Sequence, residues 1–221
     1  MRDDWSGGAA WDAGAREAFE ARLARARPES RPHHLVRKGA ALLAAGRSAD
    51  GVALLERVLT DHPDSLEAAS CAERLADHSL AQGDPAEAER QYRRSLALRP
   101  DQNGTSGQVH IGLAEALTAQ GRHEEALQAL DREPAGGLTL HSAVSRWEAA
   151  LALAAAGAGR RDEAREAARR ALALLDAPDQ FPRHPGVGRA RLDPEQQALL
   201  RELAAEGTGR RRRARWWPLR R

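Results

Sequence analysis

The segment GDPAEAERQYRRSLALRP, residues 83–100, contains the local signals of one tight turn and one complete helix. Gly83 suits the turn because glycine adopts a positive φ at little cost. Asp84 is a typical N-cap, and Pro85 follows at the first helical position, where its missing N–H is not needed. Glu87 completes a capping box with Asp84. The segment therefore predicts a turn and then a helix that runs up to the closing proline.

The same turn recurs along the chain with a nearly constant period. The turns GRSADG, GDPAEA, GRHEEA and GRRDEA begin with glycines 37, 38 and 38 residues apart: Gly46, Gly83, Gly121 and Gly159. Each glycine lies between two Ala/Leu-rich runs with helical periodicity. Five positions after each glycine stands a small residue that lets two helices approach closely: Gly51, Ala88, Ala126 and Ala164. The pattern predicts an all-α array of helical hairpins.

The repeat resembles the tetratricopeptide repeat, a family of paired helices. In the best-matching unit, Ala88, Tyr92 and Pro100 occupy the family's positions for alanine, an aromatic residue and a terminal proline. The family's first helices combine apolar residues with small ones. The matching residues here are Gly39 and Leu42, then Leu75 and Ala76, then Leu113, Ala114 and Leu117. The resemblance spans residues 32–176. It implies a right-handed superhelical array of helix-turn-helix hairpins with capping helices at both ends.

Two features depart from the family pattern. In the fourth unit Ala168 replaces the larger residue, and the stretch AAAGAGRR indicates a short insertion. The period also exceeds the family's length of about 34 residues, which indicates longer helices or connections. A related helical solenoid is the alternative.

Both ends of the array are expected to carry capping helices, because terminal repeats otherwise expose an apolar face to water. The N-terminal candidate covers residues 12–27, with Phe19 and Leu23 on one stripe. The C-terminal candidate, LDPEQQALLRELAAEG, has a leucine stripe through Leu199 and Leu203.

The predicted organisation has five parts, and Phe181 is expected to pin the loop that precedes the last helix. The parts are an N-terminal segment with its capping helix (1–30), repeats at 31–65, 66–102, 103–137 and 138–176, a Pro/Gly-rich loop (177–191), a C-terminal capping helix (192–207) and an Arg/Trp-rich disordered tail (208–221).

The charge distribution, the cysteine content and the N-terminal sequence limit the classes of protein to which the chain can belong. The net charge is +2, yet residues 210–221 hold seven basic and no acidic residues, which leaves a net charge of −5 for residues 1–209. Cys71 is the single cysteine, so no intramolecular disulfide is expected. The N-terminus MRDDWSGGAA lacks the apolar core of a secretory signal. The chain has a single lysine, a single isoleucine and a single asparagine, which indicates a GC-rich bacterial genome. We expect a cytoplasmic protein, or one peripheral to a membrane.

No catalytic chemistry is expected from the residue pattern. The eight histidines form no HExxH motif, and the chain has no CxxC motif, so we predict no metal site. A nucleophile with an oxyanion donor is missing from the sequence, and the glycine-rich stretches lack the context of a phosphate loop. We therefore predict no catalytic residues, no cofactor and no enzyme activity.

The family resemblance implies a concave groove lined by the first helices. The implied partner-binding positions are Ser70, Glu73, Asp77, Gln108, Ile111, Glu115 and Thr118. This surface is acidic at its centre, which would suit a basic or amphipathic peptide; the alternative is that its carboxylates are merely solvated. Val36 and Ala40 stand where the family's chaperone-tail clamps carry lysine and asparagine, so we expect no such clamp.

The tail RRRRARWWPLRR, residues 210–221, leaves several functions open. It can be a solvated charge run, a contact for an anionic membrane surface, a nonspecific nucleic-acid contact, or a basic peptide that occupies the acidic groove of its own chain or of a neighbour in a self-association. The candidate contacts are Arg210, Arg211, Arg212, Arg213, Arg215, Trp216 and Trp217.

Together these patterns predict a non-catalytic protein- or peptide-binding scaffold or adaptor that works through its groove. The alternative is a membrane-surface or nucleic-acid associated protein that works through its tail.

Overall fold

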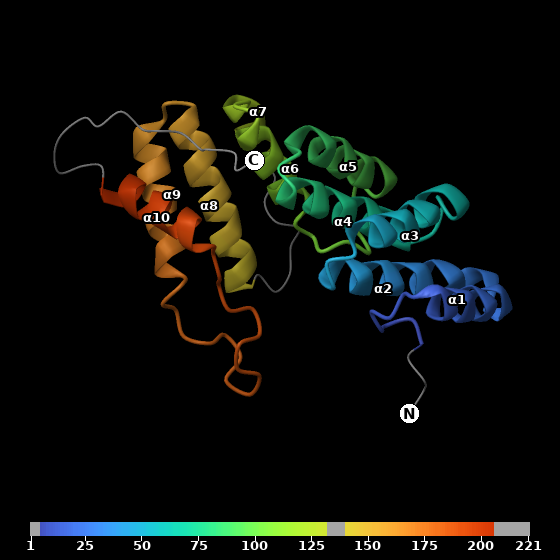
Figure 1. Ribbon diagram of the computed structural model, residues 1–221. Helices are drawn as coiled ribbons and strands as arrows, with labels where there is room; N and C mark the ends of the chain where they lie inside the picture. Colours follow the sequence, from blue (N-terminus) through green and yellow to red (C-terminus); the bar gives the residue numbers. More distant parts are fainter. Residues whose placement is uncertain (1–4, 132–139, 206–221) are drawn as a thin grey trace. The chain divides into compact units, whose positions relative to one another are not determined.

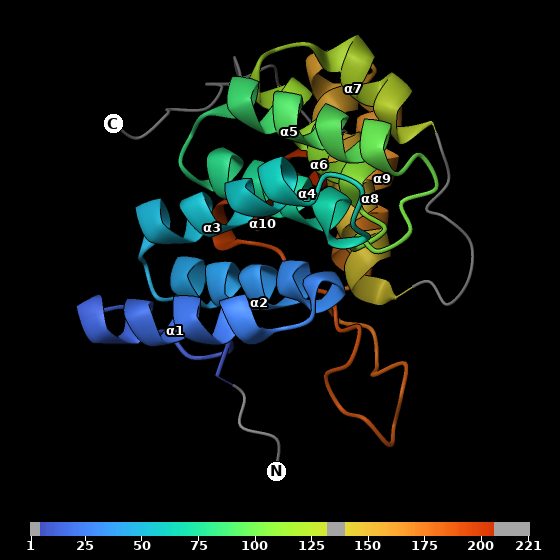
Figure 2. The same ribbon diagram turned by 90° about the vertical axis from the view of Figure 1, so that its right-hand side faces the viewer.

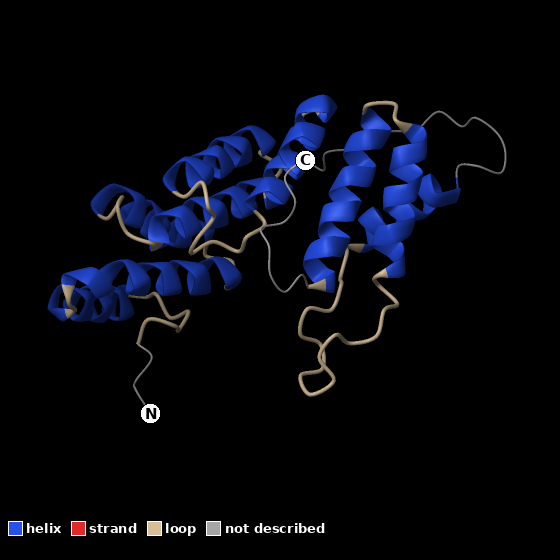
Figure 3. Cartoon of the chain, turned by 180° about the vertical axis from the view of Figure 1, so that it is seen from behind, coloured by secondary structure: helices blue, strands red, loops and turns tan. Residues whose placement is uncertain are grey.

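The computed structural model describes residues 5–131 and 140–205, and these residues form helices and loops without a strand (Figures 1 and 3). The all-α prediction is confirmed. The helices are α1 (Ala13–Arg25), α2 (Arg31–Ala44), α3 (Ser48–Asp61), α4 (Glu67–Ala81), α5 (Pro85–Leu98), α6 (Val109–Ala119), α7 (His123–Leu130), α8 (His141–Gly157), α9 (Arg161–Ala173) and α10 (Pro194–Ala205), with a 3-10 turn at Pro28–Ser30.

The four repeated glycines form the predicted turns. Gly46, Gly83, Gly121 and Gly159 have φ angles of 76°, 79°, 76° and 79°, a region that glycine enters without strain. In each turn the N–H of the residue after the glycine donates to a carbonyl near the end of the preceding helix, as in Asp84 N to Ser79 O at 2.9 Å. This bond is the signature of a helix that ends in a left-handed glycine. Local sequence alone therefore determines the four connections.

The cap of α5 forms only in part. The Asp84 side chain accepts a 3.0 Å hydrogen bond from Glu87 N, as predicted. The reciprocal half of the capping box is wrong, because Asp84 N already donates to Ser79 O. The Glu87 carboxylate instead accepts a 2.8 Å bond from the Gln91 side chain.

The chain divides into two compact units, residues 1–109 and 110–221. In unit 1, α2 packs against α3, α4 packs against α5, and α2 also contacts α4. Gly39 and Gly51 allow the close approach of α2 and α3, since a Cβ at either position would lie near the other's carbonyl oxygen. Figure 2 shows these helices in the blue-to-green part of the chain.

The N-terminal cap of unit 1 contains more than the predicted helix. Phe19 on α1 contacts both Trp5 and Trp11, with ring centroids 5.3 Å apart in each case. The Lys38 ammonium lies 5.6 Å from the centroids of the Trp11 and Phe19 rings and donates a 2.6 Å bond to Gly8 O. The single lysine thereby anchors an aromatic segment along α2, although it is only 4% exposed.

In unit 2, alanine dominates the packing of α8, α9 and α10. One cluster of buried residues comprises Ala149, Ala152, Ala167, Ala168, Ala171 and Leu200. Small side chains let helices approach closely, and Ser145 Oγ donates to Ala171 O at 3.1 Å across the α8–α9 contact. Leu200 is the fully buried leucine of α10, whereas the predicted stripe residues Leu199 and Leu203 are partly exposed.

Polar contacts of Gln180 and Gly188 hold the loop before α10. The Gln180 side chain accepts a 2.7 Å bond from His141 N, and Gly188 O accepts a 2.8 Å bond from Ser142 N. Both bonds use N–H groups at the start of α8, which have no partner inside that helix. Phe181 is half-buried, and its role in pinning the loop stays a prediction.

Candidate functional site

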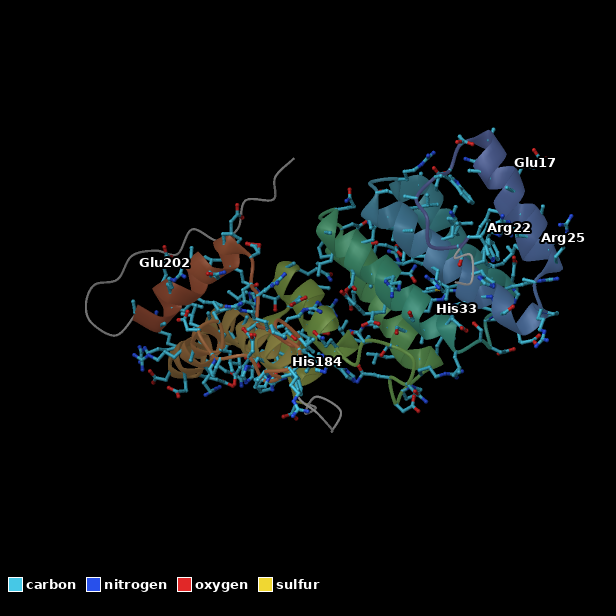
Figure 4. All side chains as sticks on the ribbon, turned by 90° about the horizontal axis from the view of Figure 1, so that it is seen from below. Glu17, Arg22, Arg25, His33, His184 and Glu202 are labelled. Carbon is cyan, nitrogen blue, oxygen red and sulfur yellow. The ribbon has the colours of Figure 1, made fainter. Side chains whose placement is uncertain are left out.

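The first helices of unit 1 each present a narrow exposed stripe. On α2 the stripe has the spacing i, i+4, i+7 and i+11, and α4 repeats that spacing. The second helices α3 and α5 pack against α2 and α4, whose other positions are buried or half-buried. We call this surface the first-helix face, and its residues are His33, Arg37, Ala40, Ala44, Ser70, Arg74, Asp77 and Ala81. Figure 4 labels His33, at the N-terminal end of the α2 stripe.

The predicted groove residues of unit 1 occupy different environments. Ser70 is half-exposed and Asp77 is exposed, so both belong to the first-helix face. Glu73 is 7% exposed and accepts hydrogen bonds from the backbone N–H of Ser106, at 2.9 Å, and from the Ser106 hydroxyl. Gln108 is half-exposed and lies immediately before α6. Glu73 thus holds the chain just ahead of α6.

The other predicted groove residues lie in unit 2. Ile111 is 3% exposed and contributes to the core. Glu115 accepts hydrogen bonds of 2.9 and 2.6 Å from the Arg146 guanidinium on α8. Thr118 is half-buried. That these residues contact a partner stays a prediction.

Each of the three predicted groove carboxylates already has a partner within the chain. Glu73 is bonded to Ser106, Glu115 is bonded to Arg146, and Asp77 accepts a 2.5 Å bond from the Tyr92 hydroxyl. A paired carboxylate offers less negative potential to a partner than a free one. The first-helix face, which carries Arg37 and Arg74 beside Asp77, is of mixed charge.

The candidate tail contacts lie outside the described residues. This holds for Arg210, Arg211, Arg212, Arg213, Arg215, Trp216 and Trp217. Over the part of the chain that the structure describes, no helix is long and apolar enough to cross a bilayer.

Residues 5–131 and 140–205 contain neither a metal-binding cluster nor an exposed thiol. No three His, Cys, Asp or Glu side chains there are placed to hold a metal ion. Burial raises the pKa of the Cys71 thiol from 9.0 to about 12, and the thiol is fully enclosed. Because the thiolate is the reactive form, Cys71 is a packing residue between α4 and its neighbours.

The paired helices, glycine turns and small-residue contacts define the class of helical-repeat proteins. Within that class, tetratricopeptide-repeat models match residues 36–103 and 79–135. Residues 36–135 of the chain therefore consist of tetratricopeptide repeats. The fourth predicted repeat, with α8 and α9, lies beyond both matched ranges.

A solved structure shares the fold. The crystal structure of MamA matches with a TM-score of 0.53 and 20% sequence identity, over 72% of this chain and 86% of that chain. At this identity the likeness establishes the fold alone. No curated protein matches the chain. Tetratricopeptide repeats are in general non-catalytic modules for protein–protein interaction, and the family therefore indicates protein partners.

Proposed function

We propose that this chain is a non-catalytic scaffold that binds a segment of a partner protein on the first-helix face of unit 1. The observation that carries the proposal is the pair of exposed stripes with the same spacing on the first helices α2 and α4. The site is rigid, since regular helices carry it.

The chemistry of the face indicates the kind of segment that fits. Ala40, Ala44 and Ala81 leave room for a partner chain to approach the helices closely. Arg37 and Arg74 flank them with positive charge, and Asp77 adds one negative charge. We propose a partner segment with charges of both signs beside small or apolar side chains, since opposite charges across an interface fix its register.

Site-specific photo-crosslinking tests the proposal even though the partner is unidentified. A photoreactive amino acid replaces Arg74 in one variant and Arg90, exposed on α5, in a control variant. In the source cell we expect a discrete crosslinked protein from position 74 and none from position 90, because only the first variant places the reactive group on the face. Crosslinking of the same protein at equal yield from both positions would contradict the proposal.

The same experiment separates the face from the tail. A chain that ends at residue 209 keeps every residue of the first-helix face but lacks residues 210–221. We expect the position-74 product to persist in this shortened chain. Its loss would assign partner capture to the tail, which is the alternative function predicted from the sequence.

A further inference from the structure

Unit 2 contains a cavity where the last hairpin meets the C-terminal capping helix. It has a volume of about 430 Å³, within the range of small-ligand pockets. The end of α9, the turn that follows it, the segment 190–192 and α10 supply its walls. The lining residues are Leu172, Leu175, Asp176, Ala190, Arg191, Leu192, Gln197 and Arg201.

The apolar part of the lining comes from α9, from the turn that follows it and from the segment before α10. Leu172, Leu175 and Leu192 are half-buried, and Ala190 is 6% exposed. Gln197 ties the walls together, because its Nε2 donates to Leu192 O at 2.8 Å and its Oε1 accepts a 3.1 Å bond from Arg201. The cavity is therefore built on helices and a braced segment.

The charged lining residues are exposed, and among the described residues they form no ion pair. Arg146 pairs with Glu115 and Arg170 with Glu148, each at 2.6 Å. Among the described residues, by contrast, Arg191 makes no hydrogen bond or ion pair, and Arg201 bonds only to the Gln197 amide.

Asp176 likewise has no hydrogen-bond or ion-pair partner within the described part of the chain. Two guanidinium groups against one carboxylate give the cavity an excess of positive charge. A ligand that matches both the apolar walls and the cations has an aliphatic group and a carboxylate, because arginine binds carboxylates with paired, charge-assisted hydrogen bonds.

We propose that this cavity is a second binding site, which takes the C-terminus of a peptide chain that ends in a large aliphatic residue. The aliphatic side chain packs against Leu172, Leu175 and Leu192, and the terminal carboxylate pairs with Arg191 and Arg201. Asp176 offers an acceptor to a peptide N–H, which a simple fatty acid lacks. The site lies in unit 2 and is independent of the first-helix face.

A titration of the ¹⁵N-labelled full chain, followed by NMR, tests the site. The probes are acetyl-Leu-Leu with a free carboxylate, its C-terminal carboxamide, and octanoate. We expect shifts at residues of α9, α10 and the segment 190–192, and a dissociation constant roughly tenfold lower for the acid than for the carboxamide, because charge-assisted hydrogen bonds are about twice as strong as neutral ones. Octanoate is expected to bind more weakly than the peptide acid.

Variants assign the preference to the two arginines. In Arg191→Gln/Arg201→Gln we expect the acid and the carboxamide to bind equally, with the carboxamide affinity unchanged. The control Arg161→Gln alters an exposed arginine at the opposite end of α9 and should keep the full preference.

Three outcomes would overturn the proposal: equal binding of acid and carboxamide to the unaltered chain, shifts confined to other segments, or a preference that survives the double substitution. Tighter binding of octanoate than of acetyl-Leu-Leu would also overturn it, by assigning the cavity to a fatty acid.

Discussion

Replacing Tyr92 by alanine should lower the free energy of unfolding of unit 1 by about 3–5 kcal/mol, the usual cost of removing a buried aromatic ring. Tyr92 is 1% exposed and is the largest fully buried side chain in the described part of the molecule. It lies on α5, and its hydroxyl donates to Asp77 on α4. The alanine variant therefore loses both the packing of the ring and the hydrogen bond between the two helices.

Urea denaturation followed by circular dichroism measures this effect. Tyr92→Phe is the matched control, since it keeps the ring and loses only the hydroxyl, at an expected cost of about 1 kcal/mol. Equal losses in the two variants would mean that the hydrogen bond, rather than the packed ring, holds α4 against α5.

Two glycine-to-alanine substitutions within helices should change stability in opposite directions. Gly14 and Gly51 lie in α1 and α3, where helix propensity favours alanine by about 1 kcal/mol. A Cβ at position 14 would lie 3.5 Å from the Asp12 carboxylate, an ordinary contact. At position 51 it would lie 2.9 Å from the backbone oxygen of Gly39 and 2.8 Å from Leu43. We expect Gly14→Ala to stabilise, and Gly51→Ala to destabilise by about 1–3 kcal/mol through overpacking.

Thermal and urea unfolding of the two variants side by side provides the measurement. The comparison isolates the close approach of α2 and α3, because the change in residue type is identical at the two positions. A stabilised Gly51→Ala variant would show that these helices separate easily, contrary to the packing described for unit 1.

The hairpins follow directly from the sequence because their signals are local. A glycine with positive φ, such as Gly83, and the Asp84 cap act within a few residues, so these signals can be recognised before the fold is seen. The periodicity of the apolar residues then determines which side of each helix is buried. The family resemblance rests on the same local features.

The environment of the acidic groove residues depends on contacts between distant positions. Glu73 bonds to Ser106, 33 residues away, and Glu115 bonds to Arg146, 31 residues away. Helical periodicity places a carboxylate on a face but does not reveal which distant donor reaches it. Counting the acidic groove residues in the sequence therefore overestimates the negative charge that is available to a partner.

The N-terminal cap contained a signal that helical periodicity does not detect. Trp5 and Trp11 stand out in a chain with only 4% aromatic residues, and Lys38 is its single lysine. Their contact joins a non-helical segment to α2, and a non-helical segment leaves no helical stripe in the sequence. The cavity beside α10 was missed for a similar reason, since the segment 190–192 forms one of its walls.

The hairpins bury their apolar faces against one another. A single hairpin cannot bury its apolar face alone, so we expect it to have no stable fold of its own. The most direct test is the far-ultraviolet circular dichroism of a peptide with residues 64–101, which contains α4 and α5. We expect less than about a quarter of its residues to be helical at 25 °C, because isolated helices of this length are marginal in water. Full helicity with a cooperative melting transition in this isolated hairpin would contradict the claim.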